Sequence, residues 1–234
     1  MGKNGSEVLF KPQPVRGFER RKILYIPVDT PLNTIGGALK KHSLKELDTP
    51  FGYAYLLKKR AVVFQAVGSP LAVIWLERFA VSGAEEVLIL GFCGALHSKS
   101  KTADPVIITK AASEEGTSRH YFPRRRVFYP SPSLSQEVRQ RLQTERLTCH
   151  TGSLVSTDAP FRETKSWLVR QRKKGLGFVD MEASAVFALA EFHGIQAAAL
   201  MLVTDNLSED EHKIRFKHPR LIKNVQDYFF PFLE

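Results

Sequence analysis

Residues 68–96 read GSPLAVIWLERFAVSGAEEVLILGFCGAL, and this stretch decides the class of fold. Pro70 stands in the first turn of a predicted helix, Ser69 is its expected cap, and Gly83 comes just past its end. Apolar side chains recur between them at helical spacing. The apolar run at 86–90 then predicts a strand covered on both faces. A helix that leads directly into a buried strand indicates a layered α/β domain.

The same alternation continues outward along the chain. Apolar runs predict further strands at 23–26, 61–67, 105–109, 177–179 and 197–203. Helical patterns are predicted at about 134–146, from the cap candidate Asp158 to about Gly175, at 182–193, and in the tail after residue 205. We therefore expect one α/β domain over residues 22–234, with a central mixed sheet flanked by helices. Residues 1–21 form a polar N-terminal extension.

Composition narrows the function classes. The 234 residues include 34 Lys or Arg and 24 Asp or Glu, which leaves a formal charge of +10. The basic clusters at 58–60, 124–126 and 172–174 are short and scattered, and no basic stripe is interleaved with aromatics. We therefore interpret the charge as solvated surface and rank nucleic-acid binding last.

The lengths of the apolar runs and the numbers of Cys and His residues narrow the expected cellular compartment and the expected disulfide and metal chemistry. No apolar run approaches the roughly 18 residues that a spanning helix needs, so no membrane partner is expected. The two cysteines, Cys93 and Cys149, cannot build a disulfide framework, and a reducing cytoplasm is the expected compartment. The seven His show no metal-ligand spacing.

Three segments follow predicted strands and carry residues suited to chemistry. They are Gly91–Gly94, Asp180–Glu182 and Thr204–Asn206. In an open α/β sheet, ligands gather at the carboxyl ends of the strands, where loops and helix N-termini converge. Acids at two neighbouring strand ends suit acid catalysis on a substrate that bears several hydroxyls.

Five segments in register resemble the nucleoside phosphorylase and hydrolase superfamily, which includes uridine phosphorylase-like and purine nucleoside phosphorylase-like enzymes. Residues 68–96 are similar to its glycine-rich turn, helix, strand and Gly-x-x-Gly loop. The other segments are SEEGTSRHYFP (113–123), HTGSLVSTDAPFRET (150–164), VDMEASAVFALAEFHG (179–194) and LVTDNL (202–207). The resemblance implies the phosphorylase/hydrolase-like architecture and assembly into homo-oligomers, dimers or hexamers.

The resemblance also implies roles for the strand-end residues. Glu182 would accept hydrogen bonds from two ribose hydroxyls, and its charge would favour a cationic, oxocarbenium-like transition state. Met181 would pack on the sugar face. Asp205 would be the catalytic acid toward a purine nitrogen, which requires a carboxyl that stays protonated near neutral pH. Taken alone, Glu182 is a first-turn carboxylate favoured by the helix dipole, and Asp205 is a cap or turn residue.

The base would lie among residues from two segments. Phe92, Cys93 and Gly94 would floor its pocket, with Cys93 as a small buried thiol rather than a nucleophile. Phe161 would pack against the base or ribose, and Arg162 would read a base edge.

The nucleophile site departs from the family pattern. After the first strand the chain reads Ile26-Pro27-Val28-Asp29-Thr30, without the Gly and Arg of phosphorylases, and without the Glu of nucleosidases. Ile89 and Phe92 replace an Arg and a small hydroxyl residue. Phosphate-binding residues therefore stay unknown; Arg119, Arg124 or Arg162 could rebuild an anion site.

The resemblance therefore predicts a nucleoside phosphorylase-like pentosyltransferase of nucleotide salvage, with phosphorolysis as the family default. Inorganic phosphate is then a possible co-substrate, and no other cofactor or metal is expected. Hydrolysis by a nucleosidase, or nucleoside sensing without catalysis, are the alternatives that the missing Arg residues leave open. A purine and a pyrimidine substrate are both compatible with the sequence.

Overall fold

The computed structural model describes residues 8–18, 22–49, 52–97, 99–208 and 213–233 of the 234-residue chain. The strands are β1 (Lys22–Ile26), β2 (Lys45–Thr49), β3 (Gly52–Leu56), β4 (Ala61–Phe64), β5 (Glu86–Ala95), β6 (Pro105–Ser113), β7 (Val127–Phe128), β8 (His150–Ser156), β9 (Phe178–Asp180) and β10 (Gln196–Asn206). The α-helices are α1 (Thr34–His42), α2 (Ser69–Ala80), α3 (Ser118–Tyr121), α4 (Pro132–Thr144), α5 (Lys165–Lys173), α6 (Ala183–His193) and α7 (Pro219–Phe229). Two short 3₁₀ turns, η1 and η2, lie at Pro160–Arg162 and Phe230–Phe232.

The strands of the described ranges form one mixed sheet, in the order β10-β6-β8-β9-β5-β1-β4-β3-β2, and the short β7 pairs with β6 beside this path. Because β10 also pairs with β5, five of these strands close into a ring, and the remaining strands extend from it as an open sheet. β5 lies parallel to both β1 and β10, which confirms the expected central mixed sheet. β6 and β8 also run parallel, whereas β10 pairs with β6 in antiparallel orientation.

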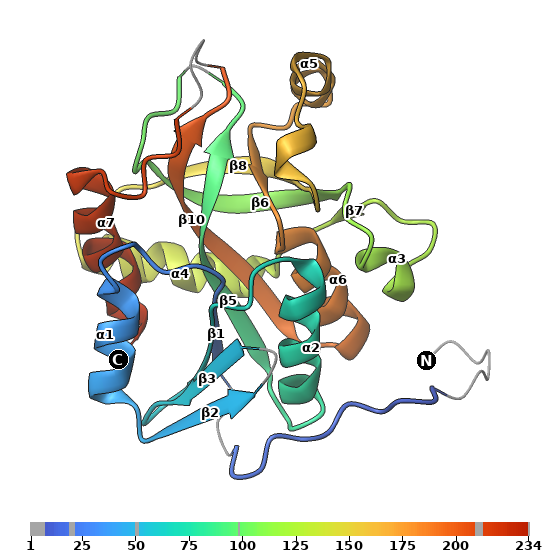
Figure 1. Cartoon of the computed structure of the whole chain (residues 1–234), viewed down its shortest axis with the longest axis vertical. Coiled ribbons are helices and arrows are strands. Elements are labelled where there is room, and N and C mark those ends of the chain that lie inside the picture. Colours follow the sequence, from blue (N-terminus) through green and yellow to red (C-terminus); the bar gives the residue numbers. More distant parts are fainter. Residues whose placement is uncertain (1–7, 19–21, 50–51, 98, 209–212, 234) are drawn as a thin grey trace.

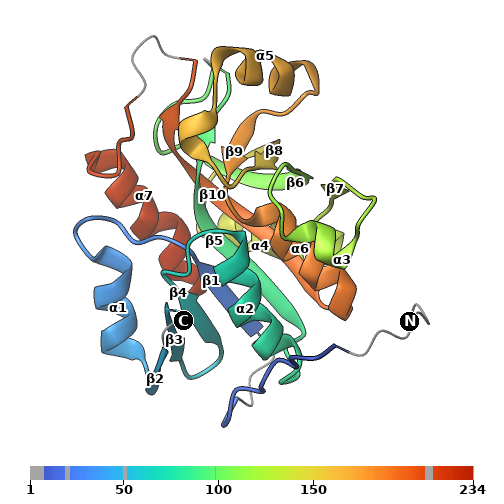
Figure 2. The same cartoon turned by 45° about the vertical axis from the view of Figure 1, so that its right-hand side comes forward.

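Helices cover both faces of this sheet (Figures 1 and 2). One apolar cluster joins α2 and α6 to one face, with Trp75, Phe79 and Phe187 among its largest buried side chains. A second cluster joins α1, α4 and α7 to the other face. These two layers bury the strands on both sides, as their continuous apolar runs predict.

Two predicted helix starts were wrong, each for a capping reason. α2 begins at Ser69 itself with Gly68 at the N-cap, and the Ser69 hydroxyl donates to the Met181 carbonyl (2.7 Å). α5 begins only at Lys165, because Thr164 caps it by accepting from Trp167 N (3.1 Å). Asp158 instead accepts from Gly116 N (2.9 Å) on another segment.

β5 and β10 run further than the apolar pattern predicts. Gly91–Gly94, expected as a loop, lies within β5, because β10 and β9 pair with it as far as Ala95. β10 likewise continues through Asp205 to Asn206. The polar ends of both strands are thus held by backbone pairing rather than by loops.

Part of the predicted N-terminal extension packs on the domain. Val15 and Phe18 are buried, and the Phe18 ring meets Phe79 of α2 edge-on at 4.9 Å between centroids. Val15 N donates to Ser82 Oγ (2.8 Å). The boundary at residue 21 lies outside the described residues and stays a prediction. Within the described ranges, every helix is too short or too polar to cross a bilayer.

Candidate active site

Glu182 lies at the N-terminal end of α6, where β9 delivers the chain to the helix. Its side chain is buried, with the residue 5% exposed. Oε1 accepts from Gly68 N (2.6 Å), in the turn before α2, and Oε2 accepts from Met181 N (3.3 Å). The carboxylate therefore turns toward α2 instead of serving its own helix.

Two other side chains satisfy the first turn of α6. Asp180 Oδ2 accepts from Ala183 N (2.8 Å), and Ser156 Oγ accepts from Ser184 N (2.9 Å). The Ser156 hydroxyl in turn donates to Asp180 Oδ1 (2.5 Å). Because these residues cap the helix, Glu182 occupies the N-cap position without making a side-chain cap of its own.

Asp180 and Glu182 lie in surroundings that disfavour their ionised forms. Burial, and then the charge of Asp180, raise the pKa of Glu182 to about 8. Burial raises the pKa of Asp180 to about 6, although its hydrogen bonds with Ser156 and backbone amides act the other way. The same two carboxyls, after burial itself, raise the pKa of the buried Tyr25 phenol. A cation or a set of hydroxyl donors would find this region favourable.

Asp205 lies two strands away from β9, at the same end of the sheet. It pairs with Gly94 across β10 and β5, and Gly94 pairs with Val179 of β9. Asp205 is 8% exposed, and its Oδ1 accepts from the Thr204 hydroxyl (2.6 Å). A Cβ placed on Gly94 would stand 3.0 Å from Asp205 Oδ2 and 3.0 Å from Val179 Cγ1. Only glycine lets β9, β5 and β10 approach so closely.

The Cys93 side chain is affected by the charges of both Asp180 and Asp205. Its thiol is buried, and its pKa is raised well above the ordinary value, first by burial and then by the charges of Asp180 and Asp205. Such a thiol stays protonated, which fits the predicted packing role rather than nucleophilic attack. Met181 is half-buried between Asp180 and Glu182, with its carbonyl held by Ser69.

The loop at 158–164 carries the other two predicted base contacts, Phe161 and Arg162. Pro160 and Glu163 line a small hollow together with Leu207, whose Cδ1 lies 2.8 Å from the Cβ position of Gly94. Phe161 and Arg162 are on the outer side of this 3₁₀ turn, and Phe161 is 96% exposed. An exposed aromatic ring at the rim of a site is available to cover a ligand.

Phe92 stands apart from these residues. Its ring packs edge-on against Phe216 (5.2 Å between centroids) and tilted against Phe229 of α7 (5.8 Å), in the apolar cluster on the α7 face. The Phe92 side chain therefore points away from the Cys93 side of β5, because successive residues of a strand face opposite layers. We call Phe92, Phe216 and Phe229 the aromatic cluster.

The residues at the positions where the family carries its phosphate or water site are engaged in packing and backbone contacts. Ile89 is fully buried in the apolar cluster of α2 and α6. Asp29 is engaged in the β1–α1 loop, where its two oxygens accept from Thr30 N (2.7 Å), Ile35 N (3.0 Å) and Gly36 N (2.8 Å). Arg119, Arg124 and Arg162 are all exposed.

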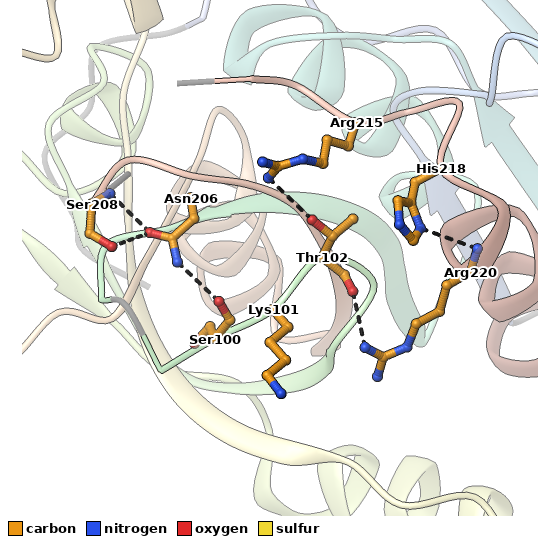
Figure 3. A pocket seen from close by; sticks show the side chains of 8 residues that line it. All are labelled: Ser100, Lys101, Thr102, Asn206, Ser208, Arg215, His218 and Arg220. Carbon is orange, nitrogen blue, oxygen red and sulfur yellow. Dashed lines mark hydrogen bonds between the residues drawn. The ribbon is translucent and has the colours of Figure 1, made fainter. Parts of the chain in front are cut away.

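A separate polar hollow of about 400 Å³ lies past the end of β10 (Figure 3). Its walls include Lys101, Arg215, His218 and Arg220, and Asn206 donates to the Ser100 carbonyl (3.0 Å) at its edge. The lining includes Asn206, the residue after Asp205, but neither Asp205 nor Glu182.

Sequence reasoning did not single out Tyr25, Ser156 or Ser184, and it named Gly68 and Asp180 only as parts of longer segments, without a role of their own. The sequence signal that could have shown the role of Asp180 was its place two residues before Glu182. That role becomes clear only when Ser156 and Ala183 are seen as its hydrogen-bond partners. Within the described ranges, no three His, Cys, Asp or Glu side chains group as metal ligands do.

Comparison with known proteins identifies the family of this chain. Residues 47–228 match the family model of the phosphorylase superfamily. A guanosine phosphorylase of Halorubrum lacusprofundi is 33% identical over 63% of this chain and 61% of its own length, so the match spans less than two thirds of that relative. A DeoD-type purine nucleoside phosphorylase of Shewanella oneidensis is 26% identical over 68% of each chain.

Solved structures agree on the fold. Purine nucleoside phosphorylase from Toxoplasma gondii, in complex with immucillin-H, has a TM-score of 0.77 at 18% identity, covering 92% of this chain and 89% of that one. The methylthioadenosine/S-adenosylhomocysteine nucleosidase of Campylobacter jejuni has a TM-score of 0.74 at 14% identity, covering 92% and 98%. With its family model spanning most of the residues, this chain belongs to the phosphorylase superfamily.

Proposed function

We propose that this protein cleaves the N-glycosidic bond of a nucleoside, with Glu182 and Met181 holding the sugar and Asp205 acting on the base. The observation that carries the proposal is the Glu182 carboxylate. It is buried at the start of α6, yet it leaves capping to Asp180 and Ser156 and turns to Gly68. A buried carboxylate that does not cap its own helix keeps acceptor capacity on both oxygens with which it can bind hydroxyl groups.

The chemistry follows from charge. Cleavage of an N-glycosidic bond places positive charge on the sugar, and the carboxyls of Asp180 and Glu182 lie close together at 6% and 5% exposure. In its ionised form this pair stabilises that charge in the transition state more than in the neutral ground state, and because the pKa of Glu182 is raised to about 8, the ionised form gains population as the pH rises. Asp205, held by Thr204 beside Gly94, would pass a proton to the departing base.

A purine nucleoside is the proposed substrate. The support comes from relatives named guanosine phosphorylase and purine nucleoside phosphorylase, and from an acid at position 205 that can protonate a purine nitrogen. Phosphorolysis, with inorganic phosphate as co-substrate, is the family default. Assembly as dimers or hexamers remains a prediction of the resemblance, and a cytoplasmic location remains a prediction from the cysteine count.

Hydrolysis is the second candidate, and a specific observation favours it. Ile89 lies in an apolar cluster, and Phe92 lies in the aromatic cluster, at the two positions where a phosphate site would need an Arg and a hydroxyl. Bidentate Arg pairs dominate anion sites of this kind. Water needs no such partners.

The test is a panel of purine and pyrimidine nucleosides incubated with the protein, with and without phosphate, while release of free base is followed. Base release that requires phosphate supports phosphorolysis, and release without it supports hydrolysis. Thermal stabilisation by a nucleoside without any base release would replace both proposals by a nucleoside sensor.

A further inference from the structure

Glu115, in the turn between β6 and α3, is a fully buried carboxyl that the proposed reaction does not use. Its Oε1 accepts from Ser113 Oγ (2.8 Å) and Ser184 Oγ (2.9 Å), and its Oε2 accepts from Ser118 N (3.0 Å). Burial alone would raise the pKa of Glu115, but the donors of Ser118, Ser113 and Ser184 outweigh it and lower the pKa. The group is therefore an anion at neutral pH.

A continuous chain of hydrogen bonds leads from this anion to the start of α6. The Ser184 side chain donates to Glu115, while the Ser184 backbone N–H donates to Ser156 Oγ (2.9 Å). Ser156 then donates to Asp180 Oδ1 (2.5 Å), and Asp180 caps Ala183. We call Glu115, Ser184, Ser156 and Asp180 the acid network.

The acid network meets Glu182 through both backbone and charge. Glu182 lies between Asp180 and the capped residue Ala183, so the network sets the backbone direction from which its side chain leaves. The charge of Glu115 acts on Asp180, and the charge of Asp180 acts on Glu182. Burying a carboxylate costs several kcal/mol unless it is well compensated, so an apolar residue would be the cheaper way to fill this space.

We propose that Glu115 is a positioning residue that, through Ser184, Ser156 and Asp180, orients the Glu182 carboxylate toward the sugar hydroxyls. This role rests on the proposed function of Glu182. The proposed site thereby includes Glu115, which lies 67 positions before Glu182 in the chain. Glu115 contacts the start of α6 through Ser184 and would act on the sugar only through the other residues of the acid network.

The experiment compares Glu115→Gln with Glu114→Gln. Glu114 is the adjacent acid, but it is half-buried and accepts from Trp167 Nε1 (2.7 Å) and Gln171 Nε2 (2.8 Å) of α5, outside the acid network. In E115Q one oxygen becomes an NH₂ group, which faces other donors and breaks the chain. For the panel nucleoside that is cleaved fastest, we expect KM to rise and kcat/KM to fall about 10- to 100-fold in E115Q. We expect less than a twofold change in E114Q.

The pH profile separates positioning from mere structure. Titratable groups that act on, or are acted on by, Asp180 and Glu182 are Tyr25 of β1, Cys93 of β5 and Glu115 itself. Cys93 also senses Asp205 of β10. Because the Glu115 charge makes ionisation of its neighbours harder, E115Q should move the acid-side midpoint of kcat/KM to lower pH. A purely structural role would lower thermal stability and leave KM and this midpoint unchanged.

Ser184→Ala provides the second variant, since it keeps every charge and removes one link. It should raise KM about threefold to tenfold with the pH midpoint retained. If E115Q folds and its KM and pH midpoint equal those of the wild type, the positioning role is overturned. If E115Q does not fold, an S184A variant with the KM of the wild type overturns it. A wild type that neither binds nor cleaves any nucleoside overturns the proposed function and this role together.

Discussion

The two sides of β5 near its carboxyl end are built in opposite ways. On the side of α6, Glu182 and the acid network gather carboxyls and hydroxyls that hold one another in place. On the side of α7, the aromatic cluster fills the space around Phe92 with rings. The contrast teaches that the chain keeps a polar site suited to hydroxyl groups on one side and supplies apolar packing on the other, where an anion would need charge.

The largest expected effect comes from removing the carboxylate proposed to bind the sugar. Glu182→Ala should lower kcat/KM by up to about 10⁴-fold, because two charge-assisted hydrogen bonds of about 1.5–3 kcal/mol each are lost. Release of free base measures the loss. Glu191→Ala, on the exposed end of the same helix, is the matched control and should stay near wild type. Equal rates in the two variants would mean that the polar side of β5 is not the sugar site.

Asp205→Asn should lower kcat roughly 10³-fold for a purine nucleoside, because the amide cannot donate a proton as an acid does. KM should change little, since the side chain keeps its shape. Asp104→Asn, which alters a surface acid paired with Arg220, is the control for a generic charge effect. A wild-type rate in Asp205→Asn would assign the base-protonating role elsewhere.

The pH dependence of the free energy of unfolding tests the polar side of β5, where Glu182 is buried. The pKa of Glu182 is raised by burial and by Asp180 from 4.5 to about 8 in the folded protein. A carboxyl that binds its proton more tightly when folded contributes stability that is present below pH 4.5 and is lost as the pH rises through 8.

The free energy of unfolding should therefore fall by a few kcal/mol across this window, as measured by urea titration at several pH values. Glu182→Gln should flatten the slope. A slope that is the same in E182Q and wild type would show that other groups titrate in this window.

The aromatic cluster is tested by Phe92→Ser. Loss of a half-buried ring from its contacts with Phe216 and Phe229 should cost about 2 kcal/mol of stability. Thermal unfolding measures this, and Phe161→Ser, which removes an exposed ring, should leave stability unchanged. If Phe92→Ser is as stable as wild type and gains phosphate-dependent cleavage, the apolar side is a blocked anion site rather than a packing unit.

The smallest expected effect concerns Asp29, the nearest carboxyl to the place where nucleosidases of the family carry a Glu. Its oxygens already accept three backbone N–H groups of the β1–α1 loop and helix. Asp29→Ala should lower stability by about 1 kcal/mol, as other lost helix caps do, with kcat nearly unchanged. A loss of kcat above 100-fold would instead make Asp29 the group that activates water.

Much of this arrangement could be predicted before any coordinates. The helix at 69–80 and the strand after it follow from spacing and from Gly83, and Glu182 and Asp205 stand out as acids that follow predicted strands, while the family resemblance adds Met181 and the expected roles. Helix starts were less predictable. Ser69 and Asp158 have the right chemistry for caps, but each bonds to a distant segment instead.

What the sequence alone determined is local and periodic: the α/β class, the alternation of elements, and the two acids of interest. Burial patterns and turn residues encode these within a few neighbouring positions. Tertiary structure alone decided that Glu115, Ser156 and Ser184 hold the start of α6, and that Phe92 faces α7. These contacts join residues 28 to 137 positions apart, and hydrogen bonds over such separations depend on how strands stack rather than on any local pattern.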